Sequence, residues 1–384
     1  MGEEKPTPQC ATQRPAVTVL SPQYCRRNLS RFTYNGNMKH LTLVLPFALP
    51  PTELAPDLVR ALQAPALAAL LSRQARATRA ACDDDARALP HELWLARTLN
   101  PAPRRAAFAA PAMRGFGLDP GGDPAAWLIV NPAHIEIARS HLALHDLRKL
   151  RLSDADARAL FDAALPLFTE LGHSLVYGDA GTWFLRAAGW NDLDTSTPDA
   201  VLGMNLGDAM PSGAQARAFR RLQNEVQMLW FDHPVNAARA RRNLAAVNAL
   251  WPWGSGATGA GAGPDTASVP APLSASGVPG WLQAAAQQVL ADPGRILDEA
   301  GAAERLLVCG TLTGPGLAGE WSAWLDALHQ LESTLFAPTL ALLARGKVQS
   351  VRLVLSHRTA LVDTTTTPMA QRKFWRRITL DTLL

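Results

Sequence analysis

The chain has 384 residues, a formal net charge of +4 and 48% hydrophobic residues, which is enough for a buried core and for two domains. Charged residues make up only 18% of the chain, which argues against extensive intrinsic disorder. Residues 1–37 carry five basic and two acidic side chains, so the rest of the chain has a net charge of only +1. Without a basic stripe, we expect no nucleic-acid partner.

The cysteines and the apolar runs indicate in which compartment the protein is found. The four cysteines are scattered without C-x-x-C spacing, which argues against a zinc site or a disulfide framework and favours a cytoplasmic location. No apolar stretch approaches the ~18 residues needed to cross a bilayer, so we expect no membrane partner. Residues 1–37, rich in Pro, Thr and Gln, are expected to form a disordered extension.

The first half of the chain begins with a strand signal followed by a helix signal. The apolar run at 40–51, HLTLVLPFALPP, is stopped by prolines and predicts a buried strand. Residues 54–78 are rich in Ala and Leu with helical spacing, and strand followed by helix indicates an α/β unit. Residues 126–138 predict a second strand.

The middle of the chain predicts a different arrangement. Residues 152–171 predict a helix with Ser153 as N-cap, and residues 173–187 predict a hairpin. Residues 213–231 predict a long helix that ends at an Asp-His-Pro break. Residues 254–280 form a Gly- and Ala-rich stretch of low complexity that predicts a flexible linker.

Helix and strand signals alternate again after the linker. We expect a helix at 281–292, a strand at 305–314, a helix at 321–346 and a strand at 348–360. The predicted fold class is therefore α/β, with a mostly parallel central sheet flanked by helices and an inserted smaller α+β lobe. The expected boundaries are an extension at 1–37, a first core segment at 38–123, the lobe at 124–250, a linker at 251–280 and a second core segment at 281–384.

Polar and aromatic residues gather between Asp232 and Trp253, and two interpretations stay open. In the first, this turn binds a polar ligand, with His and Arg as donors and Trp as a wall. In the second, it is a helix end followed by a helix capped by Asp232 or Asn236, with the tryptophans in the core.

Other chemistry-bearing residues give weaker signals. His134, His141 and His145 share neither one strand face nor one helix face, which makes a common metal site improbable. The acidic run 83–85 would radiate around a helix, so its carboxylates cannot all bind one cation. The motif F-W-R-R at 374–377 indicates aromatic anchoring of the tail with exposed arginines. Walker A, G-x-S-x-G and G-x-G-x-x-G loops are absent from the sequence.

Residues 195–254 carry a spaced pattern that resembles the archaeal-type, cofactor-independent phosphoglycerate mutases. In that group a Thr-Thr-Pro-Pro segment, a Gly and a Leu-Pro-x-Gly segment precede a helix, followed by His-Pro-Val-Asn-x-x-Arg and Ala-Asn-x-x-Trp-x-Trp-Gly. The counterparts here are Thr195 to Pro198, Gly203, Met210 to Gly213, His233 to Asn236 with Arg239, and Val247-Asn248 with Trp251, Trp253 and Gly254.

The closer resemblance is to a proteobacterial group of mutase relatives, the RpfE-type regulatory protein family. It covers most of 38–377 and includes LTLVLPFALPP, NPAHIEIARSHLAL, RRLQNEVQMLWFDHPVN and the F-W-R-R ending. The resemblance implies an alkaline-phosphatase-like core with an inserted lobe. It also implies two divalent metals held by Asp and His at the carboxyl ends of strands, beside a Ser or Thr nucleophile.

The chain departs from that pattern at the strand ends. LPFALPP provides no carboxylate after the first strand, Gly319-Glu320-Trp321 stand in a segment that supplies an Asp, a His and a Gly-Asp in the mutases, and the late strand ends in Ser356-His357. One neutral imidazole cannot hold two dications. We therefore expect no metal and no cofactor, with His134 and His357 as weak metal candidates.

The leading interpretation is a catalytically degenerate, mutase-like protein with a regulatory or ligand-binding role, which binds a phosphorylated metabolite or a protein partner. Replacing Arg239 or His233 should then remove binding and leave the melting temperature nearly unchanged. The predicted ligand-binding residues are Arg220, Arg221, Asn224, Glu225, His233, Asn236, Arg239, Asn248, Trp251 and Trp253.

Two alternatives stay open. The first is an active metal-dependent phosphatase or phosphomutase that holds Mn or Zn through atypical ligands, namely His134, His141, Glu320 and His357. The second is a protein–protein interaction module in which Trp251 and Trp253 form an exposed apolar patch.

Overall fold

The computed structural model describes residues 38–83, 86–99, 108–121, 127–138, 141–187, 189–190, 193–254, 271–298 and 303–384, without the side chains of 138 and 208. The expected extension at 1–37 and residues 255–270 of the expected linker lie outside the described residues. Two members of the acidic run, Asp84 and Asp85, also lie outside them.

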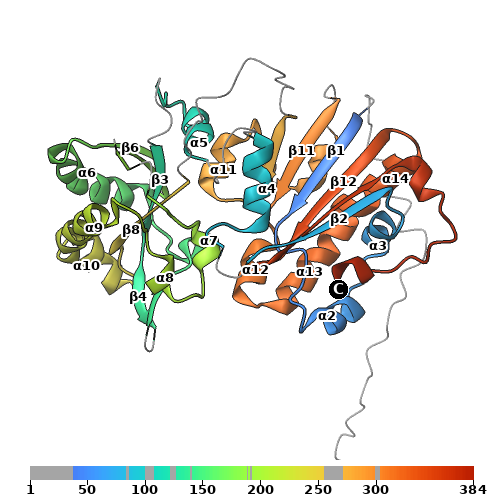
Figure 1. Ribbon diagram of the computed structural model, residues 1–384, viewed down its shortest axis with the longest axis horizontal. Helices are drawn as coiled ribbons and strands as arrows, with labels where there is room; N and C mark the ends of the chain where they lie inside the picture. Colours follow the sequence, from blue (N-terminus) through green and yellow to red (C-terminus); the bar gives the residue numbers. More distant parts are fainter. Residues whose placement is uncertain are drawn as a thin grey trace, which may run out of the picture.

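A seven-stranded sheet forms the larger of two bodies (Figure 1). Five neighbouring strands, from β10 to β12, pair in parallel, and β13 pairs antiparallel with both of its neighbours. The mostly parallel core sheet of the predicted fold class is therefore confirmed. Its strands, in spatial order, are β10 (Gln288–Val289), β9 (Leu273–Ser276), β11 (Glu304–Cys309), β1 (Met38–Leu45), β12 (Val348–Ser356), β13 (Ala360–Thr366) and β2 (Arg76–Ala81).

Both faces of this sheet are covered, because alternate residues of a strand point to opposite sides. Leu43 of β1 packs with the helices α2 (Ala55–Ala61), α3 (Pro65–Ser72), α13 (Trp321–Leu331) and α14 (Ala337–Ala344). Val44 of β1 packs on the other face with α4 (Pro90–Leu99), α5 (Ala109–Gly115) and α11 (Gly280–Ala285). Burial on two faces explains why β1 and β11 are nearly continuous apolar runs.

Two of the expected helices need correction. The helix expected over 281–292 ends at Ala285, because residues 288–289 form the edge strand β10. The helix expected over 54–78 is wrong in its second half, because the chain forms α2 and α3 and then the edge strand β2. All six residues of β2 are exposed, so no apolar periodicity marks it as a strand. The helix expected over 321–346 is confirmed as α13 and α14, joined by a π-helical turn at Glu332–Phe336.

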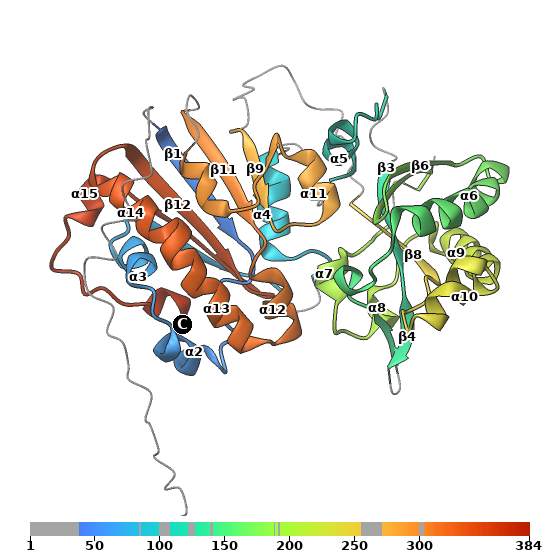
Figure 2. The same cartoon turned by 180° about the vertical axis from the view of Figure 1, so that it is seen from behind.

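The second body is a lobe with a four-stranded antiparallel sheet, clearly separated in Figure 2. The predicted hairpin is confirmed as β6 and β7, and the predicted N-cap Ser153 accepts a hydrogen bond from the Asp156 amide at 3.1 Å. The sheet order is β6 (Ser174–Asp179), β7 (Thr182–Arg186), β3 (Trp127–Ala133) and β8 (Ala249–Trp253), with α6 (Asp154–Glu170), α9 (Ala216–Phe231) and α10 (Pro234–Arg241) beside it.

Smaller elements complete the lobe. The strand expected over 126–138 breaks at His134 into β3 and β4 (Ile135–Ala138), and β4 forms a hairpin with β5 (His141–Leu144). The short helices α7 (Pro198–Val201) and α8 (Leu206–Ala209) precede α9. None of the described helices is long and apolar enough to cross a bilayer.

A continuous apolar cluster joins the lobe to the core. It contains Trp251 and Trp253 of β8 together with Val308 of β11 and Trp281 of α11. Residues 251–253 thus belong to the lobe sheet and residues 273–276 to the core sheet. The expected 251–280 linker therefore begins in strand β8, contains strand β9 and ends at the first residue of helix α11. The packing fixes the lobe against one end of the core sheet.

Candidate functional site

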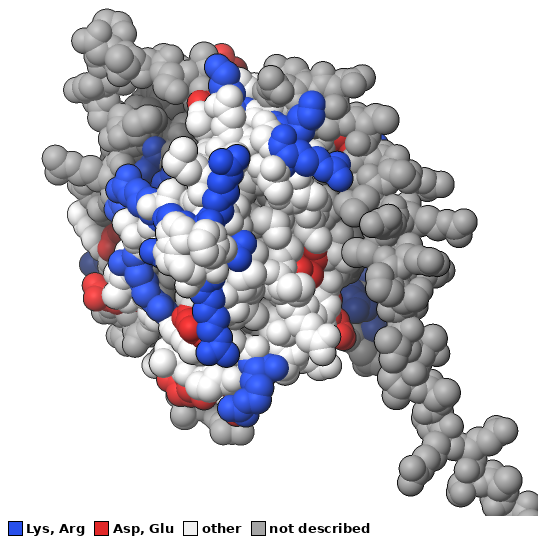
Figure 3. All heavy atoms as spheres, turned by 90° about the vertical axis from the view of Figure 1, so that its right-hand side faces the viewer, with Lys and Arg blue, Asp and Glu red and all other residues white. Residues whose placement is uncertain are grey.

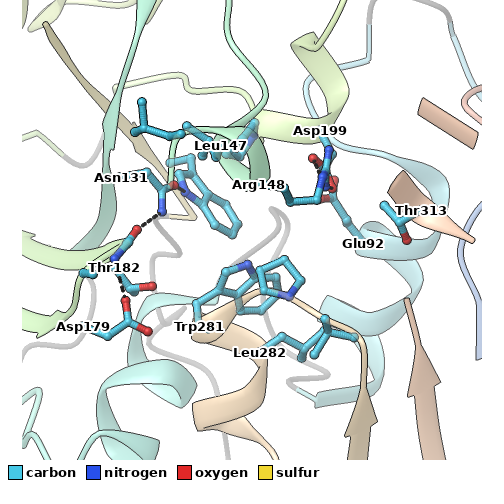
Figure 4. Close-up of a pocket in the computed structure, with 18 of the residues that line it drawn as sticks. Glu92, Asn131, Leu147, Arg148, Asp179, Thr182, Asp199, Trp281, Leu282 and Thr313 are labelled. Carbon is cyan, nitrogen blue, oxygen red and sulfur yellow. Dashed lines mark hydrogen bonds and ion pairs between the residues drawn. The ribbon is translucent and has the colours of Figure 1, made fainter. Parts of the chain in front are cut away.

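A cleft of about 600 Å³ lies between the core and the lobe (Figure 4). Its core side includes Val44 and Pro46 at the end of β1, Val308 near the end of β11 and Val278 after β9. All of these residues lie toward the carboxyl ends of parallel strands. Ligands of open α/β sheets bind at this end, so the position favours a binding site.

Apolar side chains form most of the cleft wall. The rings of Trp253 and Trp281 meet edge to face with their centroids 5.2 Å apart, and Leu282 lies beside them. The Trp253 indole N–H donates to Asn131 Oδ1, and Asn131 Nδ2 donates to the Gly181 carbonyl at 2.6 Å. These polar atoms are satisfied within the protein, so this wall offers a ligand mainly apolar contact.

Arg148 lies at one end of the cleft between two carboxylates. Its Nε is 2.9 Å from Asp146 Oδ1, and its Nη1 donates to both carboxylate oxygens of Asp199 at 2.9 and 3.0 Å. The Nη2 group donates no hydrogen bond to any of the described residues, and 33% of the side chain is exposed. Arg148 is therefore a fixed cation that can still donate toward the cleft.

Glu92 is a buried carboxyl on the same side of the cleft (Figure 4). Burial, and then the negative charge of Asp199, raise the pKa of Glu92 to about 8. Its Oε2 accepts from the Leu89 amide at 2.7 Å and from the Thr197 hydroxyl at 2.6 Å, while Oε1 bonds to none of the described residues. Glu92 is thus mostly protonated at neutral pH and can donate from Oε1.

The local sequence explains the position of Glu92. Helix α4 begins at Pro90, a residue preferred in the first turn because it needs no hydrogen-bond acceptor there. Two residues later, Glu92 reaches back to the amide that precedes the helix, as a capping-box glutamate does. The signal was present in the segment ALPHE, whereas the pairing of Arg148 with Asp199 has no signal in the sequence.

The strand ends hold apolar residues where the mutase resemblance implies metals. Phe47, two residues after the end of β1, packs in a small cluster with Leu89, Ala200 and the partly buried Leu317. Its φ of 59° is unusual for a residue with a side chain, and a Cβ on Gly316 would lie only 2.7 Å from the Phe47 Cβ. The tight approach of Gly316 indicates a packed apolar site.

The residues at the end of β12 and at the start of α4 do not provide the missing metal ligands either. Ser356 Oγ lies 3.0 Å from His91 Nδ1, and burial lowers the pKa of His91 to about 3, which keeps it neutral. His357 meets the edge of Phe47. Among the residues that the structure describes, no three His, Cys, Asp or Glu side chains are grouped to hold a metal. These residues do not fit a pair of divalent metals, which needs several anionic ligands.

Three of the predicted ligand-binding residues make internal contacts around α10. Arg239 is 0% exposed and donates to the carbonyls of Leu150 at 2.5 Å, Ala245 at 2.7 Å and Arg151 at 3.4 Å. His233, rather than Asp232 or Asn236, caps the helix by accepting from the Val235 amide at 3.2 Å.

Asn236 adds a further internal connection. Its Nδ2 donates to the carbonyls of Trp230 and Val247, both at 2.8 Å, and its Oδ1 accepts from the Val247 amide at 2.8 Å. Of the two interpretations of the Asp232–Trp253 region, these contacts match the helix end with a packed cap.

The other predicted residues are spread over the lobe. Arg220, Arg221 and Asn224 are exposed on α9, where Arg221 pairs with Glu225 at 3.1 Å. Asn248 bonds to both the amide and the carbonyl of Ile135 and so holds β4. Of the ten residues, Trp253 alone lines the described cleft. Ligand binding by the other nine stays a prediction that these contacts do not support.

The residues of the two alternatives also have defined places. Trp251 and Trp253 are each 1% exposed, so they cannot form the exposed patch that an interaction module would need. His134 meets His145 edge to face, and burial lowers the pKa of His134. Glu320 Oε1 lies 4.0 Å from Lys149 Nζ.

No protein-family model matches the chain, and no curated protein matches it. The structure is similar to the cofactor-independent phosphoglycerate mutase of Thermoplasma acidophilum, with a TM-score of 0.40, 14% identity and coverage of 90% of this chain and 94% of that one. It is also similar to the PH0037 protein of Pyrococcus horikoshii, with a TM-score of 0.47, 11% identity and coverage of 91% and 92%. At these identities the likeness concerns the fold alone.

Proposed function

We propose that this protein binds a small organic ligand in the cleft between core and lobe, and that it does not transfer phosphoryl groups through a pair of metals. The observation that supports this most strongly is the composition of the cleft. It combines apolar walls with two unused donors, Arg148 Nη2 and Glu92 Oε1, at one end. Such a mixture is typical of small-molecule sites.

The neighbouring strand ends support the second half of the proposal. Phosphoryl transfer by two metals requires several anionic ligands that offset the repulsion between the cations. Pro46, Phe47 and Ser356 stand at these positions, and Phe47 is packed with apolar neighbours. A catalytically degenerate protein would have this arrangement.

The charges around the cleft narrow the class of ligand. Arg148 is shared by two carboxylates, Asp146 and Asp199, and Glu92 is mostly neutral at pH 7. This group therefore has a net charge of about −1. It disfavours a dianionic phosphate and favours an uncharged molecule with a flat apolar body and one carbonyl or hydroxyl oxygen as acceptor. A phosphorylated metabolite is the competing class.

We propose a regulatory role and a cytoplasmic location together with ligand binding. A ligand-binding protein without phosphoryl transfer agrees with the regulatory role that the RpfE-type resemblance implies. A cytoplasmic location agrees with the free cysteines among the described residues, Cys82 and Cys309. An active phosphatase would instead retain stoichiometric Mn or Zn after purification, which metal analysis detects.

Arg148→Gln tests the site. A panel of uncharged aromatic and phosphorylated compounds is screened by thermal shift, and the affinity of each hit is measured by titration calorimetry. Loss of a hydrogen bond from a charged donor costs about 1.5–3 kcal/mol, so we expect about 10- to 100-fold weaker binding to the variant. Ala180→Trp, which places a large side chain at the lining residue Ala180, should also weaken binding.

Arg221→Gln is the matched control. Arg221 is also paired with a carboxylate and lies in the same lobe, but it does not line the cleft. Its replacement should leave the affinity unchanged. A hit that binds wild type, Arg148→Gln and Ala180→Trp equally would place its site elsewhere and contradict the proposal. Tighter binding of phosphorylated hits would overturn the inferred ligand class while leaving the cleft as the site.

A further inference from the structure

A loop near the C-terminal end of the chain exposes large apolar side chains beside cations. The loop, residues 368–378, has the sequence PMAQRKFWRRI and is called here the aromatic–basic loop. Met369 is 79% exposed, Phe374 83%, Trp375 70% and Ile378 45%. Side chains of this size seldom gather on a surface without a binding role.

The exposure is not a result of fraying, because hydrogen bonds hold the loop to the core. Lys373 Nζ donates to the Gln74 carbonyl at 2.9 Å, and Arg376 Nη1 donates to the Ser72 carbonyl at 3.2 Å. Gln371 Nε2 donates to the Ala69 carbonyl at 3.2 Å, and the amide of Thr379 donates to Ser72 Oγ at 2.9 Å. The loop, anchored through its side chains and at Thr379, presents Phe374 and Trp375 to solvent.

The charge around the loop has one sign. Four cations, Arg372, Lys373, Arg376 and Arg377, lie within it, and the sequence has no acidic residue between Asp363 and Asp381. Arg372 and Arg377 pair with no carboxylate of the described chain. Figure 3 shows Lys and Arg side chains gathered on this face around uncharged surface, with Asp and Glu sparse.

We propose that the aromatic–basic loop docks the protein on the surface of an anionic lipid membrane. Phe374 and Trp375 enter the boundary between headgroups and acyl chains, where aromatic side chains are favoured. The surrounding cations contact the lipid phosphates, as juxtaposed basic residues do at anionic leaflets. The expectation of no membrane partner rested on spanning segments alone, and a peripheral contact needs none.

The apolar residues favour a membrane over other anionic partners. Met369 and Ile378 are aliphatic and cannot stack on bases, whereas single-stranded nucleic acids bind through stacking on aromatic rings. All four apolar side chains can instead bury carbon surface in a lipid interface. The charge of the loop is complementary to the anionic headgroups.

The loop lies far from the cleft, so this inference is independent of the proposed function. Its helix α15 (Pro368–Gln371) follows β13, whose last residue Thr366 pairs with Val351 near the start of β12. It is therefore at the amino ends of the parallel strands, whereas the cleft is at their carboxyl ends. Figure 2 shows α15 and the lobe at opposite ends of the molecule. Docking through the loop leaves the cleft open.

Vesicle flotation of the full chain tests the proposal. We expect binding to vesicles of phosphatidylcholine with phosphatidylglycerol, no binding to phosphatidylcholine alone, and weaker binding as salt is added. Phe374→Ala with Trp375→Ala should reduce partitioning at least about tenfold. Arg372→Gln and Arg377→Gln should each reduce it about fivefold. Met228→Ala with Phe231→Ala, two exposed residues of α9 in the lobe, is the matched control and should change nothing.

Trp375 also provides a direct optical readout. Of the eleven tryptophans, ten are buried or half-buried and Trp375 is the exposed one. Lipids with brominated acyl chains should therefore quench part of the emission in wild type, and Trp375→Phe should lose that quenching while still binding vesicles. Absence of binding to anionic vesicles, equal loss in the control variant, or unchanged quenching in Trp375→Phe would overturn the proposal. Loop-dependent binding of single-stranded RNA without vesicle binding would assign the surface to nucleic acid instead.

Discussion

Arg239→Met is expected to destabilise the lobe rather than to remove a ligand contact. The guanidinium is fully buried and donates to three backbone carbonyls, those of Leu150, Arg151 and Ala245. Methionine has a similar unbranched shape but donates no hydrogen bond. The substitution therefore leaves buried carbonyl oxygens without partners while it keeps most of the packing.

The expected loss follows from the two short bonds. A hydrogen bond from a charged donor contributes about 1.5–3 kcal/mol, so two contribute about 3–6 kcal/mol. Relief of the cost of burying a cation offsets part of this, which leaves about 2–4 kcal/mol. For a chain of 384 residues that unfolds as one unit, the unfolding entropy is about 0.8 kcal/mol/K, so the melting temperature should fall by about 3–5 °C.

Urea unfolding and calorimetry measure this loss, with Arg241→Met on the same helix as control. Arg241 is exposed, and its replacement should leave the urea midpoint nearly unchanged. An Arg239→Met protein that is as stable as the control and yet binds no ligand would refute the structural role. It would restore the ligand-binding role that the sequence pattern indicates.

Two further predictions concern Glu92 and Phe47. The pKa of Glu92 is about 8 in the folded protein, against an ordinary value of 4.5. When the pH rises between these two values, Glu92 loses its proton in the unfolded chain but keeps it in the folded protein. The free energy of unfolding therefore falls by up to about 1.4 kcal/mol per pH unit. Glu92→Gln should remove that slope in urea titrations from pH 5 to about 8, and an unchanged slope would show that other groups cause it. Gly316→Ala should cost about 1–3 kcal/mol, because its Cβ would lie 2.7 Å from the Cβ of Phe47. Gly314→Ala in the same helix meets nothing within 4 Å and should be neutral or stabilising by up to about 1 kcal/mol, because alanine favours a helix over glycine. Equal melting temperatures of the two variants would show that the Phe47 cluster is loosely packed.

The fold was predictable where burial leaves a pattern in the sequence. Strand β1 and helix α6 carry such patterns, one as a continuous apolar run and one as an amphipathic helix with a serine cap. Strand β2 carries none, because its six residues are all exposed and its alanines favour a helix. Its pairing with β13 holds it in the sheet, and that long-range contact is invisible in a local window.

The cleft was harder to predict than the fold. Arg148 and Asp199 are 51 residues apart, and only tertiary packing brings them to Glu92. The Asp232–Trp253 region attracted attention because it concentrates residue types that binding sites use. The same types also cap helices and fill cores, as His233 and Trp251 do here. Composition alone could not separate the two roles.

A crystal structure of the protein with the tightest ligand from the screen tests the binding site most directly. We predict ligand density in the cleft against the wall that Trp253 and Trp281 form, with an oxygen acceptor within hydrogen-bonding distance of Arg148 or Glu92. Density for two metal ions beside Phe47 and Ser356, or a ligand seated at His233 and Arg239 with the cleft vacant, would contradict it.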